Sequence, residues 1–384
     1  MKFDSLYNFL DGYLSILGIP SSDTIVYRNH EEIFRHTTGY DNIKYRTPVR
    51  EDALYNMYSI TKVSTAVAAA QLIERGEIML NDPLYAYFPE YKDVQVRTYV
   101  DGEYVLVPAK TPILLKNVLN MTAGFSYNTM CKSISRVKTE TEGRSPTLDI
   151  VRAFADEPLC FHPGESFQYS LSLDIMGGVI ELVCGMKLGE YMKKNIFDPL
   201  GMNNTTFDRS EEIFAKVASE YGYVAKDDVI KELDKENNFS VFGSEYQSGG
   251  AGLISTAEDQ AIFADALAMK GVGKNGERIL SSFGVDLIRT NTLTGELLDE
   301  YHRKCPNMQG YGYGLGVRTN LDPRSVGNLS SVGEFGWDGA RSSYLSADPE
   351  TGISIFHAEH CTGFSSHTLV HPRLRNIIYS CIGE

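Results

Sequence analysis

The stretch that decides the fold is Ser59–Glu74, SITKVSTAVAAAQLIE, in which alanines and apolar residues recur at helical spacing. A helix that begins here places Ser59 and Lys62 on one face of its first turn. A serine hydroxyl is a poor nucleophile at neutral pH, and a neighbouring amine accepts its proton if burial lowers the pKa of the amine. The unpaired N–H groups at the helix N-terminus add a positive dipole end. The pattern therefore indicates a nucleophilic serine that forms an acyl-enzyme.

The Ser-x-x-Lys motif by itself leaves an alternative open. Ser-x-x-Lys occurs a second time at Ser135–Lys138, in a polar, charged stretch without an apolar stripe, and we interpret that match as a solvated surface segment. For the first match, the alternative is that Ser59 only caps the helix and that Lys62 is exposed. The local pattern does not distinguish this structural role of Ser59 from a catalytic one.

Composition limits the function classes. With 384 residues, 42% of them hydrophobic, the chain can bury a full core as one large domain or two joined ones. The formal charge of −14 and a pI near 5.1 argue against nucleic acid or an anionic membrane as partner. No run of about eighteen apolar residues predicts a transmembrane helix.

The N-terminal segment and the cysteines predict a cytoplasmic protein. Residues 1–20 carry Asp4 and Asp11 within an apolar pattern, which indicates an amphipathic surface helix rather than a signal peptide. The six cysteines lack paired spacing, so in a chain without an export signal we expect reduced thiols.

The order of elements predicts an α+β fold. Residues 23–49 alternate like a hairpin, and helical patterns cover 113–121, 147–157, 173–185 and 187–201. Ser255–Glu258 resembles a capping box that opens a helix to residue 269. Three strand-like runs follow within 311–360, and a last helix fits 371–382. Both chain ends would share one antiparallel sheet flanked by helices, with a mostly helical insertion.

We therefore expect a single domain over residues 1–384 with two parts. An α/β sheet subdomain comprises 1–78 and 245–384, and a mostly helical subdomain comprises 79–244. The active site is expected in the cleft between the two parts.

Two further segments carry candidate site residues. In PGESFQYSL, residues 163–171, Tyr169 stands at a corner and could act as a general base if an ammonium lowered its pKa. In EFGWDGA, residues 334–340, glycines bracket the only tryptophan, Trp337, and glycine within a strand often marks the approach of a ligand. Taken singly, each segment is also explained by packing, with Tyr169 and Trp337 as core aromatics.

Together, in this order and spacing, the three segments resemble those of the serine β-lactamase and penicillin-binding-protein superfamily. The resemblance is closest to the class C-like branch of esterases, D-amino peptidases and amide hydrolases. It extends from about residue 20 to residue 380 and includes NDPLYAYFPEY (81–91), NIFDPLGMNNTTF (195–207) and GGAGLISTAEDQAIFADAL (249–267). It implies a β-lactamase/transpeptidase-like fold.

The resemblance also implies residue roles. Ser59 would be the acylated nucleophile, Lys62 would help to deprotonate it, and Tyr169 would carry a proton between nucleophile and leaving group. The backbone N–H groups of Ser59 and Ala340 would form the oxyanion hole, where losing one donor typically costs about 10²–10³ in rate.

Two departures from the family pattern bear on substrate. Leu171 stands where β-lactamases and peptidases have the asparagine of Tyr-x-Asn, and Trp337-Asp338-Gly339 stands in place of Lys-x-Gly or His-x-Gly. The cation that pairs with a substrate carboxylate is thus missing, although the nearby Arg341 is a candidate substitute. We predict that these five residues contact the substrate, which would be neutral and apolar or aromatic.

The sequence thus predicts a serine hydrolase that acts on small carboxylic esters or amides without metal or organic cofactor. The alternatives are a D-amino-acid peptidase or weak β-lactamase, an acyltransferase, and a non-catalytic sensor domain. His357 and His360 lie three apart at a strand end and point to opposite faces, so we interpret them as structural rather than metal ligands. The natural substrate and the oligomeric state stay open.

Overall fold

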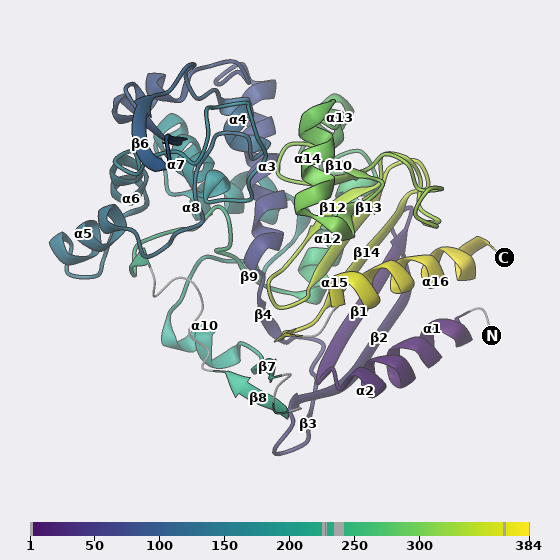
Figure 1. The fold of residues 1–384 in the computed structure, drawn as a ribbon. Coiled ribbons are helices and arrows are strands. Elements are labelled where there is room, and N and C mark those ends of the chain that lie inside the picture. Colours follow the sequence, from purple (N-terminus) through teal and green to yellow (C-terminus); the bar gives the residue numbers. More distant parts are fainter. Residues whose placement is uncertain (1–2, 225–226, 228, 234–241, 364–365, 384) are drawn as a thin grey trace.

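An eight-stranded antiparallel sheet joins the two ends of the chain (Figure 1). The computed structural model describes residues 3–224, 227, 229–233, 242–363 and 366–383. In the sheet, β1 pairs with β14 in the register Ile25↔Phe356, so the N-terminal hairpin extends the C-terminal strands. The strands, in sheet order, are β10 (Tyr311–Tyr313), β11 (Arg318–Asn320), β12 (Phe335–Asp338), β13 (Tyr344–Asp348), β14 (Ile353–Ala358), β1 (Ser21–Arg28), β2 (Glu31–Asn42) and β3 (Thr47–Pro48). The predicted shared sheet is confirmed.

Helices cover both faces of this sheet. The N-terminal segment, α1 (Asp4–Asn8), a π-helical turn (Phe9–Tyr13) and α2 (Leu14–Leu17), lies with α16 (His371–Gly383) on one face, and the two termini are close together (Figure 1). Helix α12 (Ala257–Ala268) packs against β1, β13 and β14. Successive residues of β1 point to opposite faces, so Val26 packs under the terminal helices and Ile25 joins the main core. The predicted amphipathic N-terminal helix is confirmed.

Helix α3 (Thr61–Glu74) forms the centre of the molecule. Its alanines 66 and 68–70 are almost fully buried, and α7 (Ser172–Cys184) and α13 (Ser282–Arg289) contact it. Such small side chains let neighbouring helices approach closely, so this helix suits the core rather than the surface. It ends at Arg75–Gly76, with Gly76 in the left-handed conformation, as its sequence predicts.

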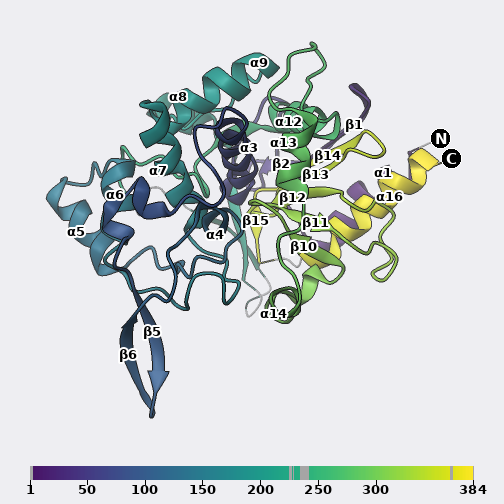
Figure 2. The same ribbon diagram turned by 90° about the horizontal axis from the view of Figure 1, so that it is seen from above.

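The helical part contains the expected helices and an additional hairpin. The helices are α4 (Leu115–Leu119), α5 (Lys132–Glu140), α6 (Thr147–Phe154), α7, α8 (Leu188–Met192), a π-helical turn (Lys193–Phe197), α9 (Asp198–Leu200) and α10 (Glu211–Lys216). The hairpin of β5 (Gln95–Val100) and β6 (Glu103–Pro108) projects away from the body of the molecule (Figure 2). Its turn at Asp101–Gly102 has positive φ at both residues, a common hairpin conformation.

The end of the predicted helical insertion returns toward the sheet. Strands β7 (Glu220–Val224) and β8 (Val229–Leu233) form a small sheet with β15 (Cys361–Thr362), and β4 (Leu54–Asn56) pairs with β9 (Ile254–Thr256). Tyr221 and Gly222 of β7 therefore pair with the C-terminal part of the chain, although the prediction assigned residues 79–244 to the helical subdomain. The backbone of the insertion thereby reaches the site described below.

Several predicted boundaries differ from the structure. The helix after β9 is capped by Thr256, whose hydroxyl accepts from Asp259 N, and not by a Ser255–Glu258 capping box. The strand-like run at 311–319 is divided into β10 and β11 by a tight turn. The polar segment around Ser135 is the amphipathic helix α5, with Ile134 and Val137 buried, although Ser135 itself is exposed.

Three helices that follow α12 in the sequence and four 3₁₀ turns complete the described chain. They are α13, α14 (Glu296–Lys304), α15 (Ser366–Leu369), and the turns Tyr58–Ile60, Leu84–Ala86, Pro89–Tyr91 and Pro306–Met308. Among the described residues, no helix combines the length and the apolar character needed to cross a bilayer.

Candidate active site

Ser59 lies in a 3₁₀ turn, Tyr58–Ile60, immediately before α3. Tyr58 adopts φ = +46°, a left-handed conformation that costs roughly 1–2 kcal/mol for a residue with a Cβ. Its hydroxyl donates to both oxygens of Glu220, at 3.0 and 2.9 Å, so the strained residue is anchored by its side chain. A strained position held in this way beside a reactive group is typical of functional sites.

Lys62, in the first turn of α3, is fully buried and contacts Ser59. Its Nζ donates to Ser59 Oγ at 3.1 Å and to the carbonyl oxygen of Gly250 at 2.7 Å. The N-cap position of α3 is Ile60, and no side chain caps the helix. The alternative interpretation of Ser59 as a cap beside an exposed lysine is therefore wrong.

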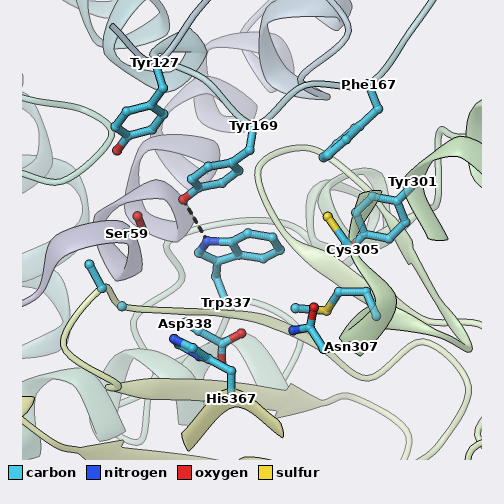
Figure 3. Close-up of a pocket in the computed structure, with 13 residues that line it drawn as sticks. Ser59, Tyr127, Phe167, Tyr169, Tyr301, Cys305, Asn307, Trp337, Asp338 and His367 are labelled. Atoms are coloured by element: carbon cyan, nitrogen blue, oxygen red, sulfur yellow. Dashed lines mark hydrogen bonds between the residues drawn. The ribbon is translucent and has the colours of Figure 1, made fainter. Parts of the chain in front are cut away.

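Tyr169 stands between two other aromatic side chains. Its ring stacks on Tyr127 at 5.7 Å between centroids and on Trp337 at 5.5 Å. The indole Nε1–H of Trp337 donates to the Tyr169 hydroxyl at 3.0 Å (Figure 3). Lys62 Nζ lies 4.6 Å from the centre of the Tyr169 ring. The residue that replaces the family's Lys or His thus contacts the predicted proton carrier.

The pKa of Tyr169 shifts in the direction opposite to the sequence expectation. Burial raises it well above its ordinary value, and the hydrogen bonds with Ser59 and Trp337 lower it by less than that. Nearby carboxylates, Asp174 and Asp338, raise it further. Tyr169 therefore stays a neutral phenol at neutral pH, which can relay a proton but does not act as a standing phenolate base.

A cavity of about 540 Å³ opens over Ser59 (Figure 3). Its walls are largely aromatic or apolar and include Phe167, Tyr301, Met308 and Trp337. Aromatic rings of this kind favour apolar ligand groups. The complete lining is Ser59, Tyr127, Phe167, Tyr169, Tyr301, Cys305, Asn307, Met308, Trp337, Asp338, Gly339, Ala340 and His367.

The structure brings most of the predicted site residues together. Ser59, Tyr169 and Ala340 line one cavity, together with Trp337, Asp338 and Gly339, and Lys62 contacts Ser59 from beneath it. A Cβ at Gly339 would lie 3.0 Å from the carbonyl oxygen of Met57, so the strand end passes close to the residues that precede Ser59. This approach carries Ala340 to the nucleophile.

Two predicted substrate contacts lie elsewhere. Leu171 is buried at the start of α7 and is not among the residues that line the cavity. Arg341 is also absent from that lining, and its Nε donates to Glu220 at 2.9 Å. Arg341 is therefore neutralised by a buried carboxylate and does not replace the missing substrate-binding cation.

Glu220 is a site residue that sequence reasoning missed. It is fully buried on β7, accepts from Asn56 Nδ2 at 2.6 Å, and binds Tyr58 and Arg341 as described. Burial would raise its pKa, but His360, Asn56 and Arg341 outweigh that effect and lower it to about 2. Tyr58 precedes Ser59 and Arg341 follows Ala340, so one carboxylate connects the two halves of the predicted oxyanion hole.

Asp174 is a second missed residue. It is buried near the start of α7 and accepts hydrogen bonds from Tyr246 and Ser248. Burial raises its pKa, while the charge of Lys62 opposes the rise. A Cβ at Gly250 would lie 2.3 Å from Asp174 Oδ2 and 3.4 Å from Lys62 Nζ, so only glycine fits between the carboxylate and the amine. The carboxylate thus lies behind the lysine, on the far side of Gly250.

The histidines considered above are engaged in buried hydrogen bonds. His357 Nδ1 lies 2.7 Å from Thr24 Oγ1 and its Nε2 lies 2.9 Å from Glu359 Oε1, while His360 Nε2 lies 3.3 Å from Glu220. They belong to separate networks, as expected for structural histidines. All six cysteines are free thiols in the structure, and Cys305 reaches the cavity.

This arrangement defines a β-lactamase/transpeptidase fold with a Ser-x-x-Lys pair at its centre. A structure of EstCE1, described as a hydrolase with promiscuous acyltransferase activity, superposes with a TM-score of 0.78 over 98% of this chain and 98% of its own, at 20% identity. The β-lactamase family model matches residues 8–367, and the chain belongs to that family, within the serine β-lactamase and penicillin-binding-protein superfamily.

Two curated relatives cover most of the chain. Protein Rv1367c of Mycobacterium tuberculosis is 28% identical over 349 residues, which are 89% of this chain and 86% of the relative. Esterase EstB of Burkholderia gladioli is 26% identical over 359 residues, which are 86% of this chain and 83% of that protein. The family and its neighbours are mostly hydrolytic enzymes, and they include esterases.

Proposed function

We propose that this protein is a serine hydrolase of the class C-like branch that cleaves small, neutral carboxylic esters or simple amides through an acyl-enzyme on Ser59. The observation that carries the proposal is the contact between Lys62 and Ser59 beside a cavity walled by Trp337. The pair supplies a nucleophile and its base, and the indole occupies the position of the cation that the family uses to bind carboxylates.

In the acylation step, Ser59 Oγ attacks the carbonyl carbon and its proton passes to Lys62 Nζ, the general base of the step. The negative charge that develops on the carbonyl oxygen is stabilised by the N–H groups of Ser59 and Ala340. The bond to the leaving group then breaks, and the departing alkoxide or amine receives a proton through the Tyr169 hydroxyl. The product is a Ser59 ester and a free alcohol or amine.

Deacylation reverses the proton movements. Water gives a proton to Lys62, directly or through the Tyr169 hydroxyl, as it attacks the acyl carbon, and Lys62 returns a proton to Ser59 Oγ when the acyl bond breaks. The indole N–H of Trp337 holds the Tyr169 oxygen, so the phenol proton is free to point toward Ser59 or the leaving group. The raised pKa of Tyr169 fits a relay that is neutral at rest.

The charges around the cavity support a neutral substrate. Among the described residues that line it there is no lysine or arginine, and Asp338 contributes a carboxylate. Burial would raise the pKa of Asp338, but the charge of Arg318 outweighs this effect and lowers it well below its usual range, so the group is ionised. A substrate carboxylate would meet a negative charge instead of a cation, which disfavours a β-lactam or a D-Ala-D-Ala peptide.

Acyl transfer to an alcohol is the second candidate. The aromatic walls could hold an organic acceptor in the position of water, and EstCE1 is described as a hydrolase with promiscuous acyltransferase activity. Product analysis after adding a small alcohol to an ester reaction separates the two: transfer gives a new ester, and hydrolysis gives only the free acid.

The test is intact-mass spectrometry with a fluorophosphonate probe, followed by turnover of p-nitrophenyl butyrate and nitrocefin. We expect one adduct on the wild type, none on Ser59→Ala, and an unchanged adduct on the matched control Ser135→Ala. Ester turnover should exceed nitrocefin turnover. Retention of most ester activity in Ser59→Ala would sink the mechanism, and labelling without turnover of any ester would favour a sensor domain.

A further inference from the structure

A cluster of potential metal ligands borders the cavity on the side opposite Tyr169. Asp338 at the end of β12, His367 in α15 and His371 at the start of α16 each offer one ligand atom, and these atoms lie within 4.8 Å of one another. Asp338 and His367 also line the cavity (Figure 3). The His367-x-x-x-His371 spacing places both rings on one side of a helical segment, with centroids 5.1 Å apart.

Two buried atoms of the cluster, Asp338 Oδ1 and His371 Nδ1, have no hydrogen-bond partner among the described residues. His371 Nε2 lies 3.0 Å from the carbonyl oxygen of Ser342, which can only accept, so Nε2 carries the N–H. When the imidazole is neutral, this single N–H leaves a lone pair on Nδ1. That lone pair faces Asp338 Oδ1 at 3.1 Å, and neither atom has a hydrogen-bond partner among the described residues.

Both orphaned atoms are buried. The His371 side chain is 3% exposed and that of Asp338 is 11% exposed. Two facing acceptors without a donor are costly in such buried surroundings, because each loses hydrogen bonds that it would make in bulk water. Arg318 Nη1 lies 3.5 Å from the other oxygen of Asp338, Oδ2, and so leaves Oδ1 unpaired. An ion at ligand distance from both Oδ1 and Nδ1, about 2.0–2.2 Å, would lie to one side of the line that joins these two atoms.

We propose that Asp338, His367 and His371 form a binding site for a divalent transition metal of the zinc class. Imidazole nitrogens and a carboxylate oxygen are ligands that Zn²⁺ prefers, at about 2.0–2.2 Å. His371 is already held by the Ser342 carbonyl through its second nitrogen, the arrangement that orients metal-binding histidines. His367 is only partly buried, so its ring can close the remaining distance. A fourth position then faces the cavity.

A bound ion changes the charge of the cavity wall. It adds two positive charges beside Trp337, where the family's cation is missing. The metal-loaded protein then accepts esters whose acyl group carries a carboxylate. This consequence rests on the proposed ester hydrolysis, whereas metal binding itself does not.

The binding test uses the full chain without an affinity tag, freed of metal with a chelator and titrated with Zn²⁺ by calorimetry. We expect one site with a Kd on the order of 10 μM or tighter, weakened at least about 10-fold in His367→Ala and in Asp338→Asn. His367 is partly exposed, so its removal should leave the core intact, and circular dichroism checks this. The control His162→Ala should bind as the wild type does.

Two results would overturn the site. One is the absence of binding up to about 1 mM Zn²⁺ or Co²⁺. NMR at pH 8 should then show a proton on both ring nitrogens of His371, because a proton takes the place of the ion. The other is binding that survives unchanged in both variants, which assigns the metal to the free thiols.

The activity test compares the hydrolysis of an anionic ester, mono-p-nitrophenyl succinate, with that of a neutral ester, p-nitrophenyl butyrate. Zn²⁺ should raise the ratio of kcat/KM for the anionic over the neutral ester by roughly 10-fold or more in the wild type and not in His367→Ala. An unchanged ratio at saturating Zn²⁺ refutes the effect on specificity. If neither ester is hydrolysed while the titration still shows the site, the proposed function fails and the metal site stands.

Discussion

Replacing Glu220 with glutamine tests whether one buried carboxylate positions both halves of the oxyanion hole. Glu220 accepts from the Tyr58 hydroxyl and from Arg341 Nε, and these residues adjoin Ser59 and Ala340. Glutamine keeps the size of the side chain, loses its charge, and turns an N–H group toward one of these donors. Both anchors should therefore loosen while the cavity keeps its lining.

The structure sets the expected magnitudes. Removing one partner of a buried ion pair costs about 3–5 kcal/mol, and Arg341 is 23% exposed and regains some hydration. We expect the free energy of unfolding to fall by about 3 kcal/mol. Complete loss of one oxyanion donor costs about 10²–10³ in rate, so a partial displacement should lower kcat roughly 10- to 100-fold. KM should change much less, because the aromatic walls are untouched.

The assay measures kcat and KM for a p-nitrophenyl ester together with urea unfolding. Glu181→Gln is the matched control, because Glu181 is a buried carboxylate on α7 that accepts from Leu188 N and lies outside the cavity lining. Glu181→Gln should lose stability with little change in kcat. If Glu220→Gln loses the same stability but keeps the wild-type kcat, Glu220 is structural only and the reasoning is refuted.

The Glu220→Gln variant should also change how the free energy of unfolding depends on pH in acid. The folded pKa of Glu220 is about 2, against 4.5 for an ordinary glutamate. A lowered carboxyl pKa stabilises the folded state above pH 4.5, and this contribution is lost as the pH falls toward 2. The shift corresponds to about 3 kcal/mol. Unfolding of the wild type and of Glu220→Gln should therefore converge between pH 4.5 and 2, and parallel pH curves would contradict the assignment.

Two other substitutions test the site. Trp337→Phe keeps the aromatic stack but removes the indole donor, which should lower kcat roughly 2- to 10-fold. Its control is Tyr313→Phe, because the buried Tyr313 hydroxyl makes no hydrogen bond among the described residues. Equal effects of the two substitutions on kcat would refute the relay. Gly250→Ala places a methyl group 3.4 Å from Lys62 Nζ and closer still to a buried carboxylate, so we expect most ester turnover to be lost with a destabilisation of about 1–3 kcal/mol. The control is Gly12→Ala, because a Cβ at Gly12 would meet no atom within 4 Å. Thermal unfolding and ester turnover are measured for both variants. Wild-type turnover in Gly250→Ala would contradict the packed geometry at this glycine.

Much of the fold could be predicted because its signals are local. The helix after Ser59, the N-terminal hairpin and the C-terminal helix each follow from periodicity and end signals within one segment. The β5–β6 hairpin carried a local signal as well, an Asp-Gly turn between alternating residues, but no element was assigned there. Its exposed strands contribute little to the core, so the omission did not affect the prediction of the sheet.

The missed site residues depend on long-range contacts. Glu220 is separated by about 160 residues from Tyr58 and by about 120 from Arg341, and nothing in EYGYV indicates that its carboxylate is buried. Asp174 lies just beyond the segment 163–171 that contains Tyr169, yet its relation to Lys62 depends on the Gly250 backbone. The His367-x-x-x-His371 pair was visible as a spacing, but Asp338 joins it only in the folded chain.

The sequence by itself determined the helix that bears Ser59 and Lys62, the shared antiparallel sheet and the three segments that meet at the cavity. These depend on side-chain periodicity and on residue types at short spacing, which act before the chain is folded. Only the tertiary structure decided that Arg341 faces Glu220, that burial keeps Tyr169 neutral, and that Trp337 bonds to it. Charge and proton affinity depend on which groups surround a side chain after water is removed, and those neighbours come from distant parts of the chain.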